Sequence, residues 1–270
     1  MTASTHDKRD TFRRLHQDGC FVLPNPWDVG SAKILQHLGF KALASTSAGM
    51  AWAMGRIDGA VSLDEVLLHL SSLAHATDLP LNADFENAFA DAPDDVARNV
   101  ALAVDTGVSG LSVEDYTGHA DQGLYPFELA VARVAAARAA IDRTQSGVLL
   151  TARSEGFIRG APDLEETIRR IKAFAEAGAD CLYAPGLRDE AQVRAVVQAV
   201  APKPINLLST GMPVATAAVW GVRRISLGGA LAALAFNHTV AAAQEIAEHG
   251  TFGEIAKAPR GQLNAIMAGG

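Results

Sequence analysis

The chain has 270 residues, of which 49% are hydrophobic and 20% are charged, and its formal net charge at pH 7 is -7. Such an acidic chain repels nucleic-acid phosphates and anionic lipid headgroups, so we expect neither nucleic acid nor a membrane as a partner. Its two cysteines, Cys20 and Cys181, cannot build a disulfide framework, and the polar stretch 1–19 is unlike a secretory signal. We therefore expect a cytoplasmic protein.

From residue 20 onward, short apolar runs alternate with longer helical patterns. The runs are apolar throughout instead of alternating with polar residues, which is typical of a parallel sheet covered on both faces. Eight such β/α units in about 250 residues predict a (β/α)8 barrel, a TIM barrel, as one domain spanning 1–270. The predicted strands are 20–25, 41–46, 80–85, 110–115, 147–153, 180–185, 204–209 and 223–228, and the clearest helices are 62–77, 94–107, 126–142, 163–179 and 189–201.

Two further segments flank the predicted barrel. Residues 5–19 predict an extra N-terminal helix at the bottom of the barrel, and residues 250–270 predict a C-terminal helical tail that packs on a neighbouring subunit. The main alternative fold is a doubly wound open sheet. The sequence has no Gly-rich dinucleotide-binding turn, which favours the barrel over that alternative.

Ionisable side chains gather where the predicted strands end. Asp84 and Glu86 follow the third strand, Glu114 follows the fourth, and Arg153 follows the fifth. Active sites of barrels lie at these strand ends. Three carboxylates cannot stay ionised together without a cation, and an oxygen-only set favours a hard ion such as Mg2+. The alternative is that each carboxylate caps a helix or pairs with a surface lysine.

The other polar candidates allow two interpretations each. Arg153 either neutralises the nearby carboxylates or clamps a substrate carboxylate. Asp58 is a turn residue by its context. His119 is a lone histidine in the loop after the fourth strand, which is more often a surface residue than a catalyst. Polar groups that could bind the other end of the same anion follow the second and seventh strands: Ser45, Thr46, Ser47 and Asn206.

Four motifs resemble the isocitrate lyase/phosphoenolpyruvate mutase superfamily. They are a long stretch at 25–59, "LNADFENAF" at 81–89, "GLSVEDY" at 110–116 and "TARSEGFIRG" at 151–160, in this order and spacing. The resemblance covers about residues 20–240. It implies a (β/α)8 barrel whose last helix is often exchanged between subunits, in homodimers or homotetramers. It also implies Mg2+ or Mn2+ and a small 2-oxo acid or enolate ligand.

The resemblance also assigns roles to single residues. Asp84, Glu86, Glu114 and Asp58 match metal-associated acids of the family, although the second of these is commonly Asp there. Arg153 matches the substrate-binding arginine. The ligand carboxylate or phosphonate would be bound by Thr46, Ser47 and Ala48, and Asn206 resembles the polar residue after the seventh strand of methylisocitrate lyases.

The sequence also departs from the family's best-known lyases. Those carry a Lys-Cys-Gly-His loop after the fourth strand, whereas the segment 114–128 here lacks Cys and Lys, so His119 or Tyr116 would replace the thiol as proton donor. A glutamate after their sixth strand is also missing, since Pro185 and Gly186 stand there.

Three functions follow as hypotheses. The first is a Mg2+-dependent lyase or decarboxylase that cleaves a C–C bond in a small, oxaloacetate-like 2-oxo or 2-hydroxy carboxylate through an enolate. Its catalytic residues would be Arg153, Glu114 and His119. The second is a phosphonopyruvate-type mutase or hydrolase, which acts on a P–C bond. The third is a barrel that binds 2-oxo acids without catalysis.

Overall fold

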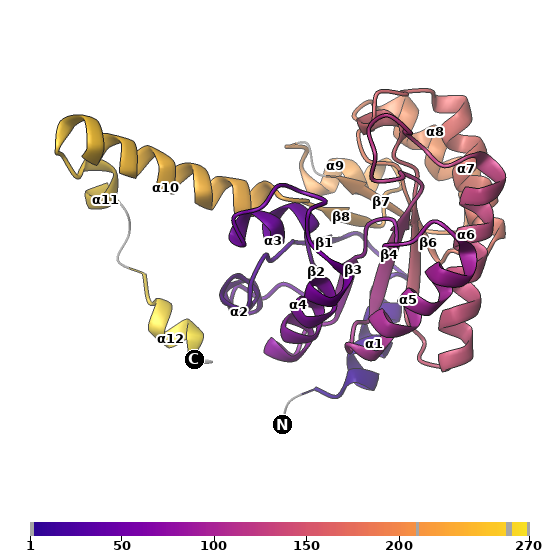
Figure 1. Cartoon of the computed structure of the whole chain (residues 1–270), viewed down its shortest axis with the longest axis horizontal. Helices are drawn as coiled ribbons and strands as arrows, with labels where there is room; N and C mark the ends of the chain where they lie inside the picture. The colour runs from indigo at the N-terminus through magenta and orange to yellow at the C-terminus, as the bar shows by residue number, and fades with distance from the viewer. Residues whose placement is uncertain (1–2, 209–210, 258–260, 269–270) are drawn as a thin grey trace.

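The computed structural model describes residues 3–208, 211–257 and 261–268. Their strands form one parallel sheet in the order β1-β8-β7-β6-β5-β4-β3-β2, which curls into a barrel with helices around it (Figure 1). The (β/α)8 fold is therefore confirmed. The strands are β1 (Phe21–Leu23), β2 (Leu43–Ala44), β3 (Leu81–Asp84), β4 (Gly110–Glu114), β5 (Leu149–Arg153), β6 (Cys181–Tyr183), β7 (Ile205–Leu208) and β8 (Arg224–Ser226).

Each observed strand lies within its predicted run but is shorter. The predicted run 204–209 also includes Ser209, which lies outside the described residues. Between the two ends of the strand order, the amide of Ala44 donates to the carbonyl of Pro24 at 3.1 Å, so β2 approaches β1 and the barrel is nearly closed.

Helices follow the strands in the expected alternation. Most begin at a side-chain cap, as where Ser62 and Glu65 form a capping box and where Asp163 and Asp189 accept backbone amides. Those around the barrel are α2 (Val29–His37), α3 (Ser47–Ala53), α4 (Leu63–Ala76), α5 (Pro93–Asp105), α6 (Phe127–Thr144), α7 (Leu164–Glu176), α8 (Glu190–Val200) and α9 (Val214–Val219), with a 3-10 turn, η1 (Gly156–Ile158), before α7.

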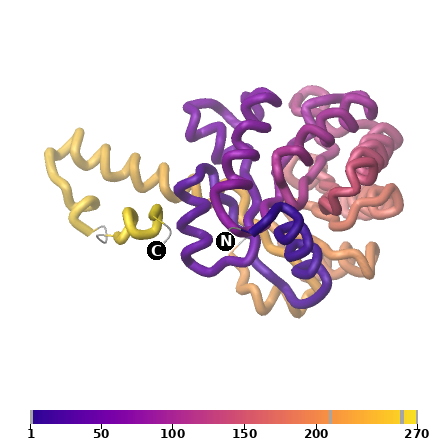
Figure 2. Tube along the Cα trace, turned by 90° about the horizontal axis from the view of Figure 1, so that it is seen from below, coloured from indigo at the N-terminus to yellow at the C-terminus, as the bar shows by residue number. Residues whose placement is uncertain are grey.

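The predicted N-terminal helix is present as α1 (Thr5–Leu15) and lies across the bottom of the barrel (Figure 2). Its Phe12 is fully buried and packs in a small core with Leu23, Ala42 and Ala44. The end of the barrel opposite the strand C-termini is thereby closed, so the open mouth lies at the strand C-termini.

The C-terminal helices leave the barrel. After β8, α10 (Ala230–His249) extends away from it, α11 (Gly253–Lys257) turns back, and α12 (Leu263–Met267) returns toward α2 (Figure 1). The predicted tail 250–270 is therefore helical where it is described; residues 258–260 and 269–270 lie outside the described part. Among the described helices, none is both long and apolar enough to span a membrane.

Candidate active site

The strand ends surround a cavity of about 540 Å³ at the barrel mouth. Asp84, Glu114 and Arg153 are the last residues of β3, β4 and β5, and the β4–β5 register places Glu114 beside Arg153. The cavity wall includes all of the predicted site residues: Ser45, Thr46, Ser47, Ala48, Asp58, Asp84, Glu86, Glu114, His119, Arg153 and Asn206. The structure thus brings together residues that the sequence separates by more than 150 positions.

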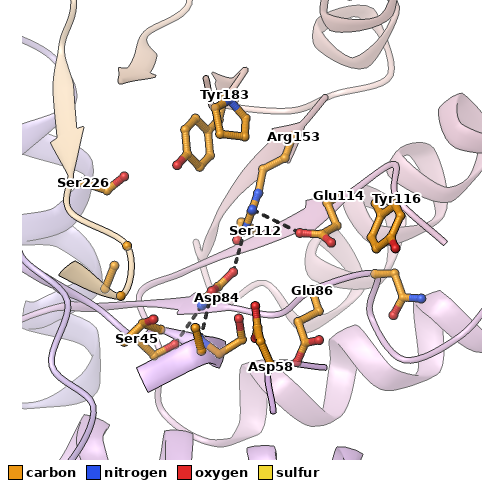
Figure 3. A pocket seen from close by; sticks show the side chains of 18 of the residues that line it. Ser45, Asp58, Asp84, Glu86, Ser112, Glu114, Tyr116, Arg153, Tyr183 and Ser226 are labelled. Carbon is orange, nitrogen blue, oxygen red and sulfur yellow. Dashed lines mark hydrogen bonds and ion pairs between the residues drawn. The ribbon is translucent and has the colours of Figure 1, made fainter. Parts of the chain in front are cut away.

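Arg153 lies at the centre of a carboxylate cluster (Figure 3). One terminal nitrogen contacts Asp84 Oδ1 at 2.6 Å, and the other lies 3.2 Å from Glu114 Oε2 and 2.9 Å from Glu155 Oε1. Its Nε also donates to Glu155 Oε1 at 2.9 Å. Every guanidinium nitrogen therefore has an acidic partner, as the neutralising interpretation of this residue expects.

The electrostatics of the cluster follow from burial. Burial, reinforced by the charges of Glu155 and Asp84, raises the pKa of Glu114 well above its usual range, although Arg153 opposes the shift. For Arg153, burial alone would lower the pKa, but the surrounding carboxylates, led by Glu155, raise it well above the usual value. Arg153 is therefore a permanent cation among groups whose charge depends on it.

A second carboxylate group lies beside this cluster. Burial first, and then the charges of Asp84 and Asp58, raise the pKa of Glu86 to about 8. Figure 3 shows the Asp58 and Glu86 side chains next to each other below Asp84. Glu86 also has a left-handed backbone, with φ of 46°, and its carbonyl accepts the amide of Glu114. A non-glycine residue held this way beside a cavity is typical of functional sites.

The chemistry of this donor set fits a hard divalent cation. Asp58, Asp84 and Glu86 supply only oxygen atoms, and burial, followed by the charges of Asp84 and Asp58, raises the pKa of Glu86, so a cation beside these acids would favour its ionised form. In the part of the chain that the structure describes, no three such side chains are close enough to ligate one ion together. Mg2+ keeps several of its waters in proteins, so these carboxylates could bind a hydrated ion. The identity of the ligands stays a prediction.

The segment after β2 supports Asp84 from the other side. Ser45 Oγ accepts the Asp84 amide at 2.8 Å, and the Ser47 amide donates to Asp84 Oδ2 at 3.1 Å. Thr46 is buried, and its hydroxyl caps α3 by accepting the Gly49 amide. Both Asp84 oxygens thus have partners, which fixes the orientation of its carboxylate toward the cavity.

Asn206 belongs to a polar network at the cavity floor. Its side-chain amide donates to Ser226 Oγ at 2.9 Å and accepts from Arg224 Nε at 2.8 Å. Arg224 is only 2% exposed and also contacts Thr151 and Asn82. This network holds the Asn206 amide in one orientation below the substrate space.

His119 lies at the rim of the cavity and is exposed. The loop around it is closed by Thr117, whose hydroxyl accepts the His119 amide at 3.2 Å and donates to the Gly123 carbonyl at 2.9 Å. The histidine is thus near the site but free of the buried cluster. A proton-donor role for it stays a prediction.

Some residues of the site were not assigned a role from the sequence. Glu155 is fully buried, Tyr183 lies with its ring 5.1 Å from the Arg153 guanidinium, and Arg159 and Arg224 line the cavity. Glu155 was visible as an acid two residues beyond Arg153. Nothing in the sequence marked Arg224 as a cavity residue, because a charged residue at the start of an apolar run is expected to mark where the strand begins.

Comparison with known proteins decides the family. The family model described as phosphoenolpyruvate phosphomutase matches residues 12–247. The chain belongs to this family. The resemblance to the isocitrate lyase/phosphoenolpyruvate mutase superfamily is thereby confirmed, and with it an enzyme, which disfavours the non-catalytic barrel.

Relatives within the superfamily carry several names. A Burkholderia cenocepacia J2315 structure described as a lyase/mutase is 41% identical, with a TM-score of 0.94 and coverage of 98% of this chain and 96% of that one. Oxaloacetate decarboxylase of Marinomonas sp. (strain MWYL1) is 30% identical over 221 residues, which are 78% of this chain and 74% of that protein. Oxaloacetate acetylhydrolase with its product oxalate is 27% identical, with a TM-score of 0.87 and coverage of 97% and 94%.

Proposed function

We propose that the chain cleaves a C–C bond in a small, oxaloacetate-like 2-oxo or 2-hydroxy carboxylate through an enolate, with Mg2+ or Mn2+ as cofactor. The observation that carries the proposal is the Arg153-centred carboxylate cluster, which opens into a cavity of about 540 Å³. Cavities of about 300–1,000 Å³ suit small ligands. The relatives named for reactions of oxaloacetate make such an acid the first substrate to test.

The charges of the site suit the formation of an enolate. Asp58, Asp84, Glu86 and Glu114 would hold the divalent ion, which when bound supplies Lewis-acid stabilisation of an oxygen that gains negative charge. Arg153 is a fixed cation beside the same space, so it stabilises that charge without reorganising. Ser45, Thr46, Ser47 and Ala48 on one side and Asn206 on the floor would orient the substrate carboxylate.

The enolate that bond cleavage leaves then needs one proton. In a decarboxylation, the bond to the leaving carboxylate breaks, carbon dioxide departs, and the electron pair forms the enolate. A proton must finally reach the carbon that lost the carboxylate. His119, at the exposed rim of the cavity, would deliver it.

The first experiment tests Asp84. We expect Asp84→Asn to lower oxaloacetate turnover at least about 100-fold, because removing a charged group that acts in the transition state costs about 3 kcal/mol or more. The matched control is Asp95→Asn, since Asp95 pairs with Arg98 on the surface of α5. Thermal unfolding of each protein with and without Mg2+ measures binding separately. Unchanged turnover in Asp84→Asn would contradict the proposal.

A second candidate is phosphorus–carbon chemistry. The observation in its favour is the family description itself, phosphoenolpyruvate phosphomutase, which covers residues 12–247. The same cluster would stabilise an enolate formed when a P–C bond of a phosphonopyruvate-like compound breaks. Turnover of phosphonopyruvate without turnover of oxaloacetate would decide for this function.

A further inference from the structure

A second arginine, Arg159, faces the cavity from another element. It directly follows the 3-10 turn η1, and its amide donates to the carbonyls of Glu155 at 3.1 Å and Gly156 at 3.2 Å. The turn is tight, since a Cβ on Gly156 would lie 2.8 Å from the Ala161 carbonyl oxygen. The base of the Arg159 side chain is therefore held in place.

The guanidinium group of Arg159 has a fixed orientation but makes no short contact with its acidic neighbours. Its guanidinium carbon lies 3.9 Å from the centre of the Tyr116 ring, a stacking contact that fixes its plane. Its Nε is 3.6 Å from Glu155 Oε2, and a terminal nitrogen is 4.0 Å from Glu114 Oε1. Neither distance is a hydrogen bond. About a third of the side chain, 34%, stays exposed.

The two arginines thus differ in what they can still bind. The guanidinium nitrogens of Arg153 all contact acidic partners at 2.6–3.2 Å. Arg159 lies farther from its acidic neighbours, so its N–H groups can still donate to a ligand. Both lie against the same carboxylate, Glu114, on its two oxygens. A ligand bound at the cluster around Arg153 would therefore have Arg159 within the reach of a group one or two bonds away.

We propose that Arg159 binds the second anionic group of the substrate, so that the substrate is a 2-oxo acid with a carboxylate or phosphonate on the carbon next to its carbonyl. This inference rests on the proposed function and makes it more specific. A planar guanidinium can bind either oxyanion through paired hydrogen bonds. Acids without that group would bind without using Arg159.

The test compares ligands that differ only in the second group. Oxaloacetate carries a carboxylate, phosphonopyruvate a phosphonate, and pyruvate and 2-oxobutyrate carry neither. With Mg2+ present, KM or Ki and the shift of the unfolding midpoint are measured for each ligand on wild type, Arg159→Gln, Arg159→Lys and Arg98→Gln. The last variant removes the same charge from the surface of α5, where Arg98 pairs with Asp95.

For Arg159→Gln we expect KM for a dianionic ligand to rise about 10- to 100-fold, as for loss of a charge-assisted hydrogen bond. The KM or Ki for pyruvate and 2-oxobutyrate should change less than about 3-fold. Arg159→Lys should restore part of the lost affinity for the dianionic ligand. The ligand with the larger dependence on Arg159, oxaloacetate or phosphonopyruvate, identifies the second group.

Two results would overturn the inference in different ways. If wild type turns over one of the dianions and Arg159→Gln weakens all four ligands equally, or none of them, Arg159 does not read the second group, while the proposed function stands. If no 2-oxo acid is turned over or shifts the unfolding midpoint of wild type, the inference fails, and turnover of a 2-hydroxy acid such as malate then decides the proposed function separately. Unchanged unfolding of Arg159→Gln without ligand confirms that the variant is folded.

Discussion

His16 connects the N-terminal helix to the polar network under the cavity. Its Nδ1 lies 2.8 Å from the Phe12 carbonyl, so Nδ1 carries the proton and Nε2 is left to accept from Arg224 at 3.3 Å. The ring also packs between Phe12 and Phe21. Burial, together with the charge of Arg224, lowers the pKa of His16 to about 3. The folded protein therefore needs this histidine neutral.

This histidine predicts a pH dependence of stability. Below pH 6.5 the unfolded chain binds a proton at His16 that the folded chain does not bind until about pH 3, so the free energy of unfolding falls as the pH falls. Between pH 7 and pH 5 we expect wild type to lose about 1–2 kcal/mol more than His16→Gln. Urea unfolding at both pH values measures the difference, and equal losses would contradict the assignment.

At the residue scale, the sequence predicted the site well where strand ends decide it. Asp84, Glu114 and Arg153 converge as expected, because consecutive parallel strands end at one edge. Arg159 could not be placed, since it reaches the cavity from a 3-10 turn, and no hydrophobic periodicity marks such a turn. The sequence could not decide whether Arg153 neutralises the nearby carboxylates or clamps a substrate carboxylate. Only the distances in the structure show that Glu155 is also among its acidic partners.

Among the elements, α1 makes contacts that its sequence does not reveal. Its basic side chains reach backbone carbonyls at the ends of barrel helices. Lys8 donates to Ala74 in the last turn of α4 and to Thr77 just after it, and Arg9 donates to Val104 in the last turn of α5 and to Val108 beyond it. Cations are favourable at helix C-termini. The periodicity predicted the helix and its place at the bottom, but these long-range bonds depend on how the barrel closes.

The apolar contact of α1 gives a prediction about this element. Phe12 is fully buried, and its ring would be replaced by a cavity in Phe12→Ala. We expect the free energy of unfolding to fall by about 3–5 kcal/mol, and by a smaller amount in Phe12→Leu, which fills part of the space. Urea unfolding checks this order. Equal stability of wild type and Phe12→Ala would show that α1 is not docked under the barrel.

At the scale of the whole molecule, α10 extends away from the barrel, and its main contacts within the described residues are with α11 (Figure 1). Ala232 is its buried residue, while exposed apolar side chains follow along its length: Leu234, Phe236, Val240 and Ile246. A helix this apolar needs another surface to cover it. The predicted contact with a neighbouring subunit agrees with this shape, and we propose a homodimer or homotetramer in which α10 packs on another copy. The resemblance implied an exchanged last helix, but the residues of α10 alone could not predict its path, because an apolar helix pattern does not show which surface the helix packs against.

The oligomer is tested by placing charge on α10. Phe236 and Val240 are four residues apart and share a helix face, and they are 37% and 52% exposed. We expect light scattering to show a dimer or tetramer for wild type and a monomer for the double variant Phe236→Asp, Val240→Asp. The control is Leu68→Asp, which places a charge at an apolar position on α4 that is 71% exposed. A monomeric wild type would contradict the proposal.

The position of α10 has a consequence for the order of synthesis on the ribosome. Every described residue that lines the cavity precedes Ala230, the first residue of α10. The last strand of the barrel, β8, joins β1 through the pair Phe21 and Arg224, so the sheet is completed only when nearly all of that sequence has emerged. No described residue of α10 lines the cavity, so the pocket can form before the proposed pairing of subunits through α10.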